Sequence, residues 1–246
     1  MKINDGIEAV DSKVYSILMI GQSNMAGRGD FADVEKIKNP NCYMLRMGRW
    51  QPMSEPVNPD RYIFLEYGDF HSGISLAASF ADDMAKDTGK KIGLIPCADG
   101  GTSLNKWMPG EVLFDHAVMQ AKLAMRSSEL VGIIWHQGEA DARLDETIDS
   151  YKDRFIRMIT EMRRELGVDA PVVLGEIAYE INPKYEVTPE RSKRINEVFL
   201  EITKELPRLA LASSAGLPMK PDGIHFNAVG ARELGHRYYE KFKELL

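Results

Sequence analysis

The chain of 246 residues is long enough for one large α/β domain, and 44% hydrophobic with 28% charged residues is an ordinary globular composition. Its formal net charge of −6 argues against a general affinity for nucleic acid or for an anionic membrane surface. No apolar run is long enough to span a bilayer, and no signal-peptide core precedes the first apolar run. We therefore expect a cytoplasmic protein with no membrane or nucleic-acid partner.

Apolar runs alternate with segments of helical periodicity along the chain. We predict strands over 14–20, 42–46, 91–96, 131–135 and 171–177, with a further short strand over 209–212. We predict helices over 74–87, 111–127, 145–166 and 189–206, and a final helix capped by Asn227. Strands that alternate with helices indicate a parallel sheet covered on both faces. The fold expected is α/β: a single flavodoxin-like, three-layer α/β/α domain over residues 1–246, with about five parallel strands.

The stretch 47–72 departs from this alternation. Pro52, Pro56 and Pro59 argue against a regular element in it. Loops of this length in compact domains are usually functional or disordered, and the aromatic residues of this one favour order. Two interpretations stand equally: the loop forms one wall of a substrate cleft, or its aromatic side chains pack on the core.

Ser23 stands directly after the first predicted strand, within the stretch Gly21–Arg28. Open parallel sheets bind ligands beyond the carboxyl ends of their strands, so Ser23 lies where such a protein carries its chemistry. A simple polar turn after the strand is the alternative. The stretch is not the Gly-x-Ser-x-Gly nucleophile elbow, because Met25 stands where that motif has its second glycine.

A second signal comes from the far end of the chain, where Asp222 stands three residues before His225. A carboxylate at that spacing in a loop can fold back and orient the imidazole. Serine, histidine and a carboxylate are the residue types of a nucleophile, its general base and the group that orients the base. Alone, Asp222 would be a turn residue and His225 a loop histidine. Together with Ser23 they predict a catalytic triad.

Four blocks of the chain resemble the SGNH hydrolases and, among them, the sialate O-acetylesterase and acetylxylan esterase-like proteins of carbohydrate esterase family 6. The blocks are Gly21–Arg28, Pro96–Ser103, Trp135–Asp141 and Asp222–Asn227. They span nearly the whole chain in the order of the family, which is far more specific than any single block. The resemblance implies the SGNH hydrolase fold and the triad of Ser23, Asp222 and His225. It implies no cofactor, and no residue cluster has the spacing of a metal site.

Acyl transfer also needs hydrogen-bond donors for the oxyanion of its tetrahedral intermediate. The candidates are the backbone N–H of Ser23, the backbone N–H of Gly101 with Gly100 in reserve, and the side-chain amide of Gln137. Many SGNH enzymes have asparagine in the block of Gln137, and the glutamine is similar to the sialate O-acetylesterase-like group. An amide one methylene longer still offers N–H donors. His136 precedes Gln137 on the strand, points to the opposite face and is expected to be structural.

Three further residues of these blocks are candidates for substrate contact: Asn24, Gly100 and Glu139. For Asn24 the alternative is that it braces its serine neighbour or the loop. For Glu139, together with Asp141, the alternatives are that it holds Arg28, fixes the loop, or belongs to a solvated helix entry.

We therefore expect a serine carboxylic-ester hydrolase that removes O-acetyl groups from a carbohydrate through an acetyl-enzyme. The partner, an acetylated xylan, oligosaccharide or sialic acid, is implied by the resemblance alone. The rival activities are another SGNH ester or thioester hydrolase and an O-acetyltransferase. A non-catalytic sugar-binding module is the rival from another class, and it would be expected to lack a triad residue. The sequence leaves the oligomeric state open.

Overall fold

The computed structural model describes residues 13–60 and 71–246, which include one seven-stranded sheet. Its strands are β1 (Val14–Gly21), β2 (Cys42–Arg46), β3 (Arg49–Pro52), β4 (Lys91–Pro96), β5 (Ser128–His136), β6 (Val172–Gly175) and β7 (Leu209–Ala212). They lie in the order β3-β2-β4-β1-β5-β6-β7, and every neighbouring pair is parallel except β2 with β3. The five neighbouring strands β4-β1-β5-β6-β7 have the 2-1-3-4-5 order of flavodoxin-like sheets when they are numbered along the chain. The β2–β3 pair extends this sheet at one edge.

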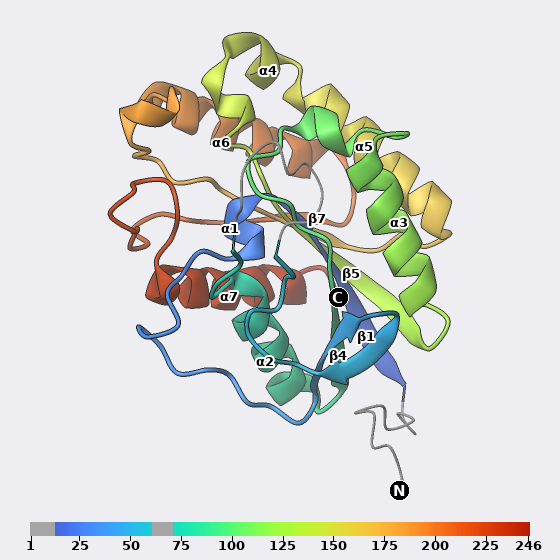
Figure 1. The fold of residues 1–246 in the computed structure, drawn as a ribbon. Helices are drawn as coiled ribbons and strands as arrows, with labels where there is room; N and C mark the ends of the chain where they lie inside the picture. Colours follow the sequence, from blue (N-terminus) through green and yellow to red (C-terminus); the bar gives the residue numbers. More distant parts are fainter. Residues whose placement is uncertain (1–12, 61–70) are drawn as a thin grey trace, which may run out of the picture.

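Helices cover both faces of the sheet (Figure 1). They are α1 (Ser23–Ala26), α2 (Leu76–Thr88), α3 (Val112–Ala124), α4 (Asp145–Asp149), α5 (Tyr151–Leu166), α6 (Pro189–Glu205) and α7 (Ala228–Lys243), with 3₁₀ turns at Leu104–Trp107, Asp141–Arg143 and Pro183–Tyr185. The helices α2 and α7 pack together on one face, and α3, α5 and α6 pack side by side on the other. This confirms the predicted three-layer α/β/α fold. No helix in the described residues is both long and apolar enough to cross a membrane.

Two predictions about local structure are wrong. The stretch 47–72 is not irregular throughout, because β3 pairs with β2 as an antiparallel hairpin at the sheet edge. Pro52 ends this strand, and an edge strand tolerates a residue that lacks the N–H donor. The predicted helix over 145–166 is divided at Ser150 into α4 and α5. The Ser150 hydroxyl donates to the carbonyl of Glu146, a side-chain bond that bends helices.

The prediction about the aromatic residues of the loop 47–72 can be compared with the structure at only one of them. Trp50 is buried in the core, as the packing interpretation predicts. Residues 61–70, which carry four of the five aromatic side chains, lie outside the described residues. The two ends of the loop, 52–60 and 71–72, are described and lie beside the site treated below.

The site lies at the carboxyl ends of the two central strands β1 and β5, which end side by side. Gly21 of β1 pairs with His136 of β5, and the backbone N–H of Gln22 donates to the carbonyl of His136 at 2.9 Å. A Cβ atom on Gly21 would lie 2.2 Å from that carbonyl oxygen, and the φ of Gly21 is +133°. Only glycine allows this close approach. The loops that follow β1 and β5 therefore start side by side at the switch point of the sheet, where such folds bind ligands.

Candidate active site

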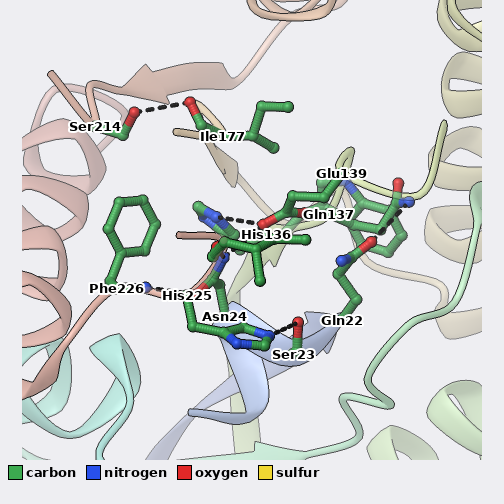
Figure 2. Close-up of polar contacts among 12 residues, drawn as sticks. Gln22, Ser23, Asn24, His136, Gln137, Glu139, Ile177, Ser214, His225 and Phe226 are labelled. Atoms are coloured by element: carbon green, nitrogen blue, oxygen red, sulfur yellow. Dashed lines mark hydrogen bonds and ion pairs between the residues drawn. The ribbon is translucent and has the colours of Figure 1, made fainter. Parts of the chain in front are cut away.

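Ser23, His225 and Asp222 lie within hydrogen-bonding distance of one another, although about 200 positions separate the serine from the other two. The Ser23 hydroxyl lies 3.0 Å from His225 Nε2, as Figure 2 shows, and His225 Nδ1 lies 2.8 Å from Asp222 Oδ2. Ser23 is the first residue of α1, and His225 stands in the loop before α7. The carboxylate holds the proton of the ring on Nδ1, so Nε2 faces the serine hydroxyl as an acceptor.

The surroundings of Asp222 and His225 set their charges for this arrangement. Burial acts to raise the pKa of Asp222, but the backbone N–H groups of Ile224 and His225 donate to its Oδ1 and hold its pKa below the usual value. Burial lowers the pKa of His225 below its usual value, although Asp222 opposes that shift. Near neutral pH the site therefore combines an ionised carboxylate with a neutral imidazole, which is the state that a general base needs.

Asn24 forms hydrogen bonds that hold the loop carrying His225 in place. Its Oδ1 accepts from the backbone N–H of Phe226, and its Nδ2 donates to the carbonyl of Ile224, both at 3.1 Å. The same nitrogen donates to Glu139 Oε1 at 2.5 Å. Asn24 is buried, and all three contacts point into the protein. The predicted substrate contact of Asn24 is therefore not what the structure shows, and its geometry matches the alternative in which it braces the loop.

Glu139 is also directed into the protein, away from any position that a substrate could reach. Its side chain is 1% exposed, and burial raises its pKa to about 7 against the opposing N–H groups of Gly138, Glu139 itself and Asn24. Its Oε1 lies 3.9 Å from Nε2 of His136, another fully buried residue. His136 Nδ1 lies 2.9 Å from the hydroxyl of Tyr238, and burial lowers the pKa of His136 to about 3. The structural role predicted for His136 is confirmed, and substrate contact by Glu139 is corrected to an interior contact.

Gln137 is fully buried, with both ends of its amide in contact with the protein. Its Nε2 donates to Asp141 Oδ2 at 2.7 Å, to the carbonyl of Thr102 at 3.1 Å and to Gln22 Oε1 at 3.2 Å. Its Oε1 accepts from the Tyr151 hydroxyl at 2.8 Å. An amide nitrogen with three protein acceptors has no N–H left for a substrate. In this structure the Gln137 amide donates within the protein, which does not favour the predicted oxyanion role.

Gly101 occupies the turn after β4, the strand next to β1. Its φ is +74°, and a Cβ atom there would meet nothing within 4 Å. The turn therefore leaves open space around the backbone of Gly101. A backbone N–H that donates to a substrate requires such space. Gly100 is buried beside it.

A small pocket opens beside Gly100, next to the triad residues rather than between them. It is lined by Ala26 and Arg28 after β1, by residues 96–100 at the end of β4, and by Asn58 and Ser72 from the ends of the predicted loop 47–72. Polar side chains dominate this lining outside the β4 end. No cluster of histidine, cysteine, aspartate or glutamate in the described residues could hold a metal ion.

Sequence reasoning missed the residues that hold Gln137. Asp141 forms an ion pair with Arg154 at 2.9 Å, and Tyr151 stands at the start of α5. The contact of Gln137 with Asp141 is local, four residues along the chain, whereas its contact with Tyr151 joins the end of β5 to α5 and does not follow from spacing. Gln22 was not singled out either, although it stands next to Ser23 in the first of the four blocks.

Known proteins resemble this chain over nearly its whole length. The family model described as "Carbohydrate esterase, sialic acid-specific acetylesterase" matches residues 13–244. The Arabidopsis thaliana protein named "Probable carbohydrate esterase At4g34215" is 27% identical over 237 residues, covering 89% of this chain and 86% of that protein.

Solved structures share the fold. The crystal structure of that Arabidopsis thaliana protein matches with a TM-score of 0.82 at 23% identity, over 95% of this chain and 99% of that chain. NanS matches with a TM-score of 0.74 at 16% identity, over 94% and 97% of the two chains. A carbohydrate acetylesterase from Xanthomonas citri matches with a TM-score of 0.64 at 20% identity, over 94% of this chain and 56% of that one. The chain belongs to the family of carbohydrate esterases described as sialic acid-specific acetylesterases, and the protein is an esterase.

Proposed function

We propose that the protein removes O-acetyl groups from a carbohydrate, with Ser23 as the nucleophile. The observation that carries the proposal is the bridge that His225 makes between the Ser23 hydroxyl and the Asp222 carboxylate. In the first step Ser23 Oγ bonds to the acetyl carbonyl carbon, and its proton moves to His225 Nε2. That proton then passes to the sugar oxygen as the ester bond breaks, which leaves an acetyl-enzyme.

In the second step water attacks the acetyl group on Ser23. His225 takes a proton from the water and returns it to Ser23 Oγ as acetate leaves. The oxyanion of each tetrahedral intermediate accepts from the backbone N–H of Ser23 and from that of Gly101. The first N–H groups of a helix lack intrahelical acceptors, and Ser23 opens α1.

The pocket beside Gly100 supports an acetyl group on a hydroxylated substrate. Arg28, Asn58 and Ser72 line it together with Asp99, which is buried. These side chains suit the hydroxyl groups of a sugar, and the small pocket leaves little room for a long acyl chain. The family description favours an acetylated sialic acid over acetylated xylan.

A substrate panel tests the proposal. Acetate release is measured from O-acetylated sialic acids, acetylated xylan and p-nitrophenyl acetate, with the Ser23→Ala variant as the control. We expect wild-type turnover of the acetylated sugars, and a loss of on the order of 10⁴-fold in kcat for the variant. Release of acetate from none of them, or equal release by Ser23→Ala, would contradict the proposal. Transfer of acetyl to a second sugar in place of water would indicate an O-acetyltransferase.

A further inference from the structure

We propose that the side-chain amide nitrogen of Gln22 is a third donor to the oxyanion, and that Gln137 orients it. This inference rests on the proposed function, because the oxyanion forms only if Ser23 attacks an ester. Gln22 is the residue before Ser23 and occupies the N-cap position of α1, with 2% of its surface exposed. Its side chain makes no cap hydrogen bond, so it is available for another contact.

A chain of hydrogen bonds fixes which end of the Gln137 amide is oxygen. The indole Nε1 of Trp135 can only donate, and it lies 3.1 Å from the Tyr151 hydroxyl oxygen. With that oxygen accepting from the indole, the Tyr151 proton is free to point to Gln137 Oε1, at 2.8 Å. The oxygen of the Gln137 amide therefore faces Tyr151.

The nitrogen end of the same amide is fixed independently. Gln137 Nε2 faces Asp141 Oδ2 and the carbonyl of Thr102, and both atoms only accept. Arg154 donates to the other carboxylate oxygen of Asp141 at 2.9 Å, so both oxygens of this group act as acceptors. With nitrogen on this side, Gln137 presents an N–H donor to Gln22. The atom of Gln22 that faces it must therefore be Oε1.

This orientation leaves the Gln22 amide nitrogen facing away from Gln137. Figure 2 shows the oxygen of Gln22 on the dashed line to Gln137 and its nitrogen on the other side, where Ser23 lies. No described residue accepts a hydrogen bond from this nitrogen, yet it is not among the completely enclosed polar atoms that lack a partner. It therefore keeps some exposed surface, and our proposal places the carbonyl oxygen of the substrate against it.

The chemistry of the first step needs a donor at this position. As Ser23 Oγ bonds to the carbonyl carbon, the π electrons of the carbonyl move to its oxygen, and the serine proton moves to His225. A fixed neutral N–H donor stabilises that negative charge, and it does so more strongly in the transition state than in the ground state. Gln22 is thus assigned as a catalytic residue and Gln137 as a positioning residue.

The test compares the same substitution at both glutamines, Gln22→Met and Gln137→Met, with p-nitrophenyl acetate as substrate. Methionine keeps the chain length and removes the donors. We expect Gln22→Met to lower kcat by about 10²–10³-fold with KM and Tm little changed, the usual cost of one oxyanion donor. We expect Gln137→Met to lower kcat less and Tm more, because it leaves the buried Tyr151 and Asp141 side chains short of a partner.

The double variant decides whether Gln137 acts through Gln22. If it does, Gln22→Met/Gln137→Met loses no more kcat than Gln22→Met alone. Losses that multiply would make Gln137 an independent donor and overturn the inference. A Gln22→Met enzyme within threefold of wild-type kcat would also overturn it.

Two further outcomes are considered: a Gln137 variant that does not fold, and a wild-type enzyme that shows no activity. Should Gln137→Met fail to fold, the nearly isosteric Gln22→Glu takes its place, and it must lose at least as much kcat as Gln22→Met because its charge opposes the oxyanion. Retained activity in Gln22→Glu overturns the inference. A wild-type enzyme that releases no acetate would remove the proposed function and this inference together, whereas full activity in the Gln22 variants removes the inference alone.

Discussion

At the scale of single residues, the site depends on the protonation state of His225. Burial lowers its pKa below the usual value of about 6.5, with Asp222 in partial opposition. In its proposed role as general base His225 works only while it is neutral, so a lowered pKa would keep the enzyme active to more acidic pH. The ionised Asp222 keeps the proton of the neutral ring on Nδ1 and so leaves Nε2 for Ser23.

We predict that the acidic limb of kcat/KM has its midpoint below pH 6.5. The profile is measured with p-nitrophenyl acetate, and the free-enzyme pKa is read from kcat/KM because that parameter reports the free enzyme. The matched control is a melting curve at each pH, which separates titration from unfolding. A midpoint above pH 6.5 in folded enzyme would show that the carboxylate outweighs burial at this histidine.

Glu139 supplies a second prediction at this scale, on stability. Its folded pKa of about 7 lies above the unfolded value near 4.5, with burial as the main cause and Asp141 adding to it. The folded protein therefore holds one more proton than the unfolded chain between these pH values. Its contribution to stability is complete below about pH 4.5 and is lost as the pH rises to about 7.

The Glu139→Gln variant keeps the acceptor for Asn24 and removes the titration. One proton accounts for about 1.4 kcal/mol of stability per pH unit, which is roughly 3 °C of Tm for a chain of this length. We predict that the Tm of wild type minus the Tm of Glu139→Gln falls with this slope from pH 5 to pH 7. The difference is read from paired thermal melts in the same buffers. A flat difference would show that Glu139 stays ionised in the folded protein.

At the scale of elements, the carboxyl ends of β1 and β5 hold the two halves of the site in contact. Gly21 allows the backbone of β1 to approach His136 closely, and this approach starts the turn that presents Ser23. Gly89, at the end of α2, also has a positive φ, but a Cβ atom there would meet nothing within 4 Å. Both glycines have a positive φ, +133° at Gly21 and +66° at Gly89, and they differ most in the space around them.

We predict that Gly21→Ala costs far more than Gly89→Ala. Alanine at Gly89 should cost on the order of 1 kcal/mol, the price of a left-handed conformation with a Cβ. Alanine at Gly21 must also push β1 and β5 apart, so we expect a larger fall in Tm and at least a tenfold loss of kcat in the folded fraction. Equal Tm values for the two variants would mean that the strand ends can separate freely.

The pocket between the β1 and β4 loops gives a prediction on acyl length. Each methylene that finds an apolar wall contributes about 0.8 kcal/mol of binding, and the small pocket beside Gly100 has room for few methylenes. We predict a kcat/KM for p-nitrophenyl acetate well above that for the octanoate ester. A steady rise from acetate to octanoate would indicate a lipase-like enzyme.

At the scale of the whole molecule, the sequence predicted the sheet and its layers, and it named the three residues that the structure brings within hydrogen-bonding distance. Their catalytic roles are part of the proposed function. The buried run of β1 and the Asp222–His225 spacing were local signals with clear chemistry. The division at Ser150 was missed because one side-chain hydrogen bond overrides the helix propensity of the segment. The edge strand β3 was missed because its proline argued against a strand, although an edge strand tolerates proline. The roles of Asn24, Glu139 and Gln137 were misjudged for another reason. The direction of an amide or a carboxyl group depends on partners such as Tyr151 and Arg154, which only the fold brings near.

Covalent trapping shows directly whether Ser23 is the residue acylated during turnover. The enzyme is treated with a fluorophosphonate, and the adduct is mapped by peptide mass spectrometry in wild type, Ser23→Ala and His225→Ala. The account predicts one adduct on Ser23 in wild type, none in Ser23→Ala, and labelling slowed by at least 10²-fold in His225→Ala. An adduct on any other residue, together with esterase activity retained by Ser23→Ala, would contradict it.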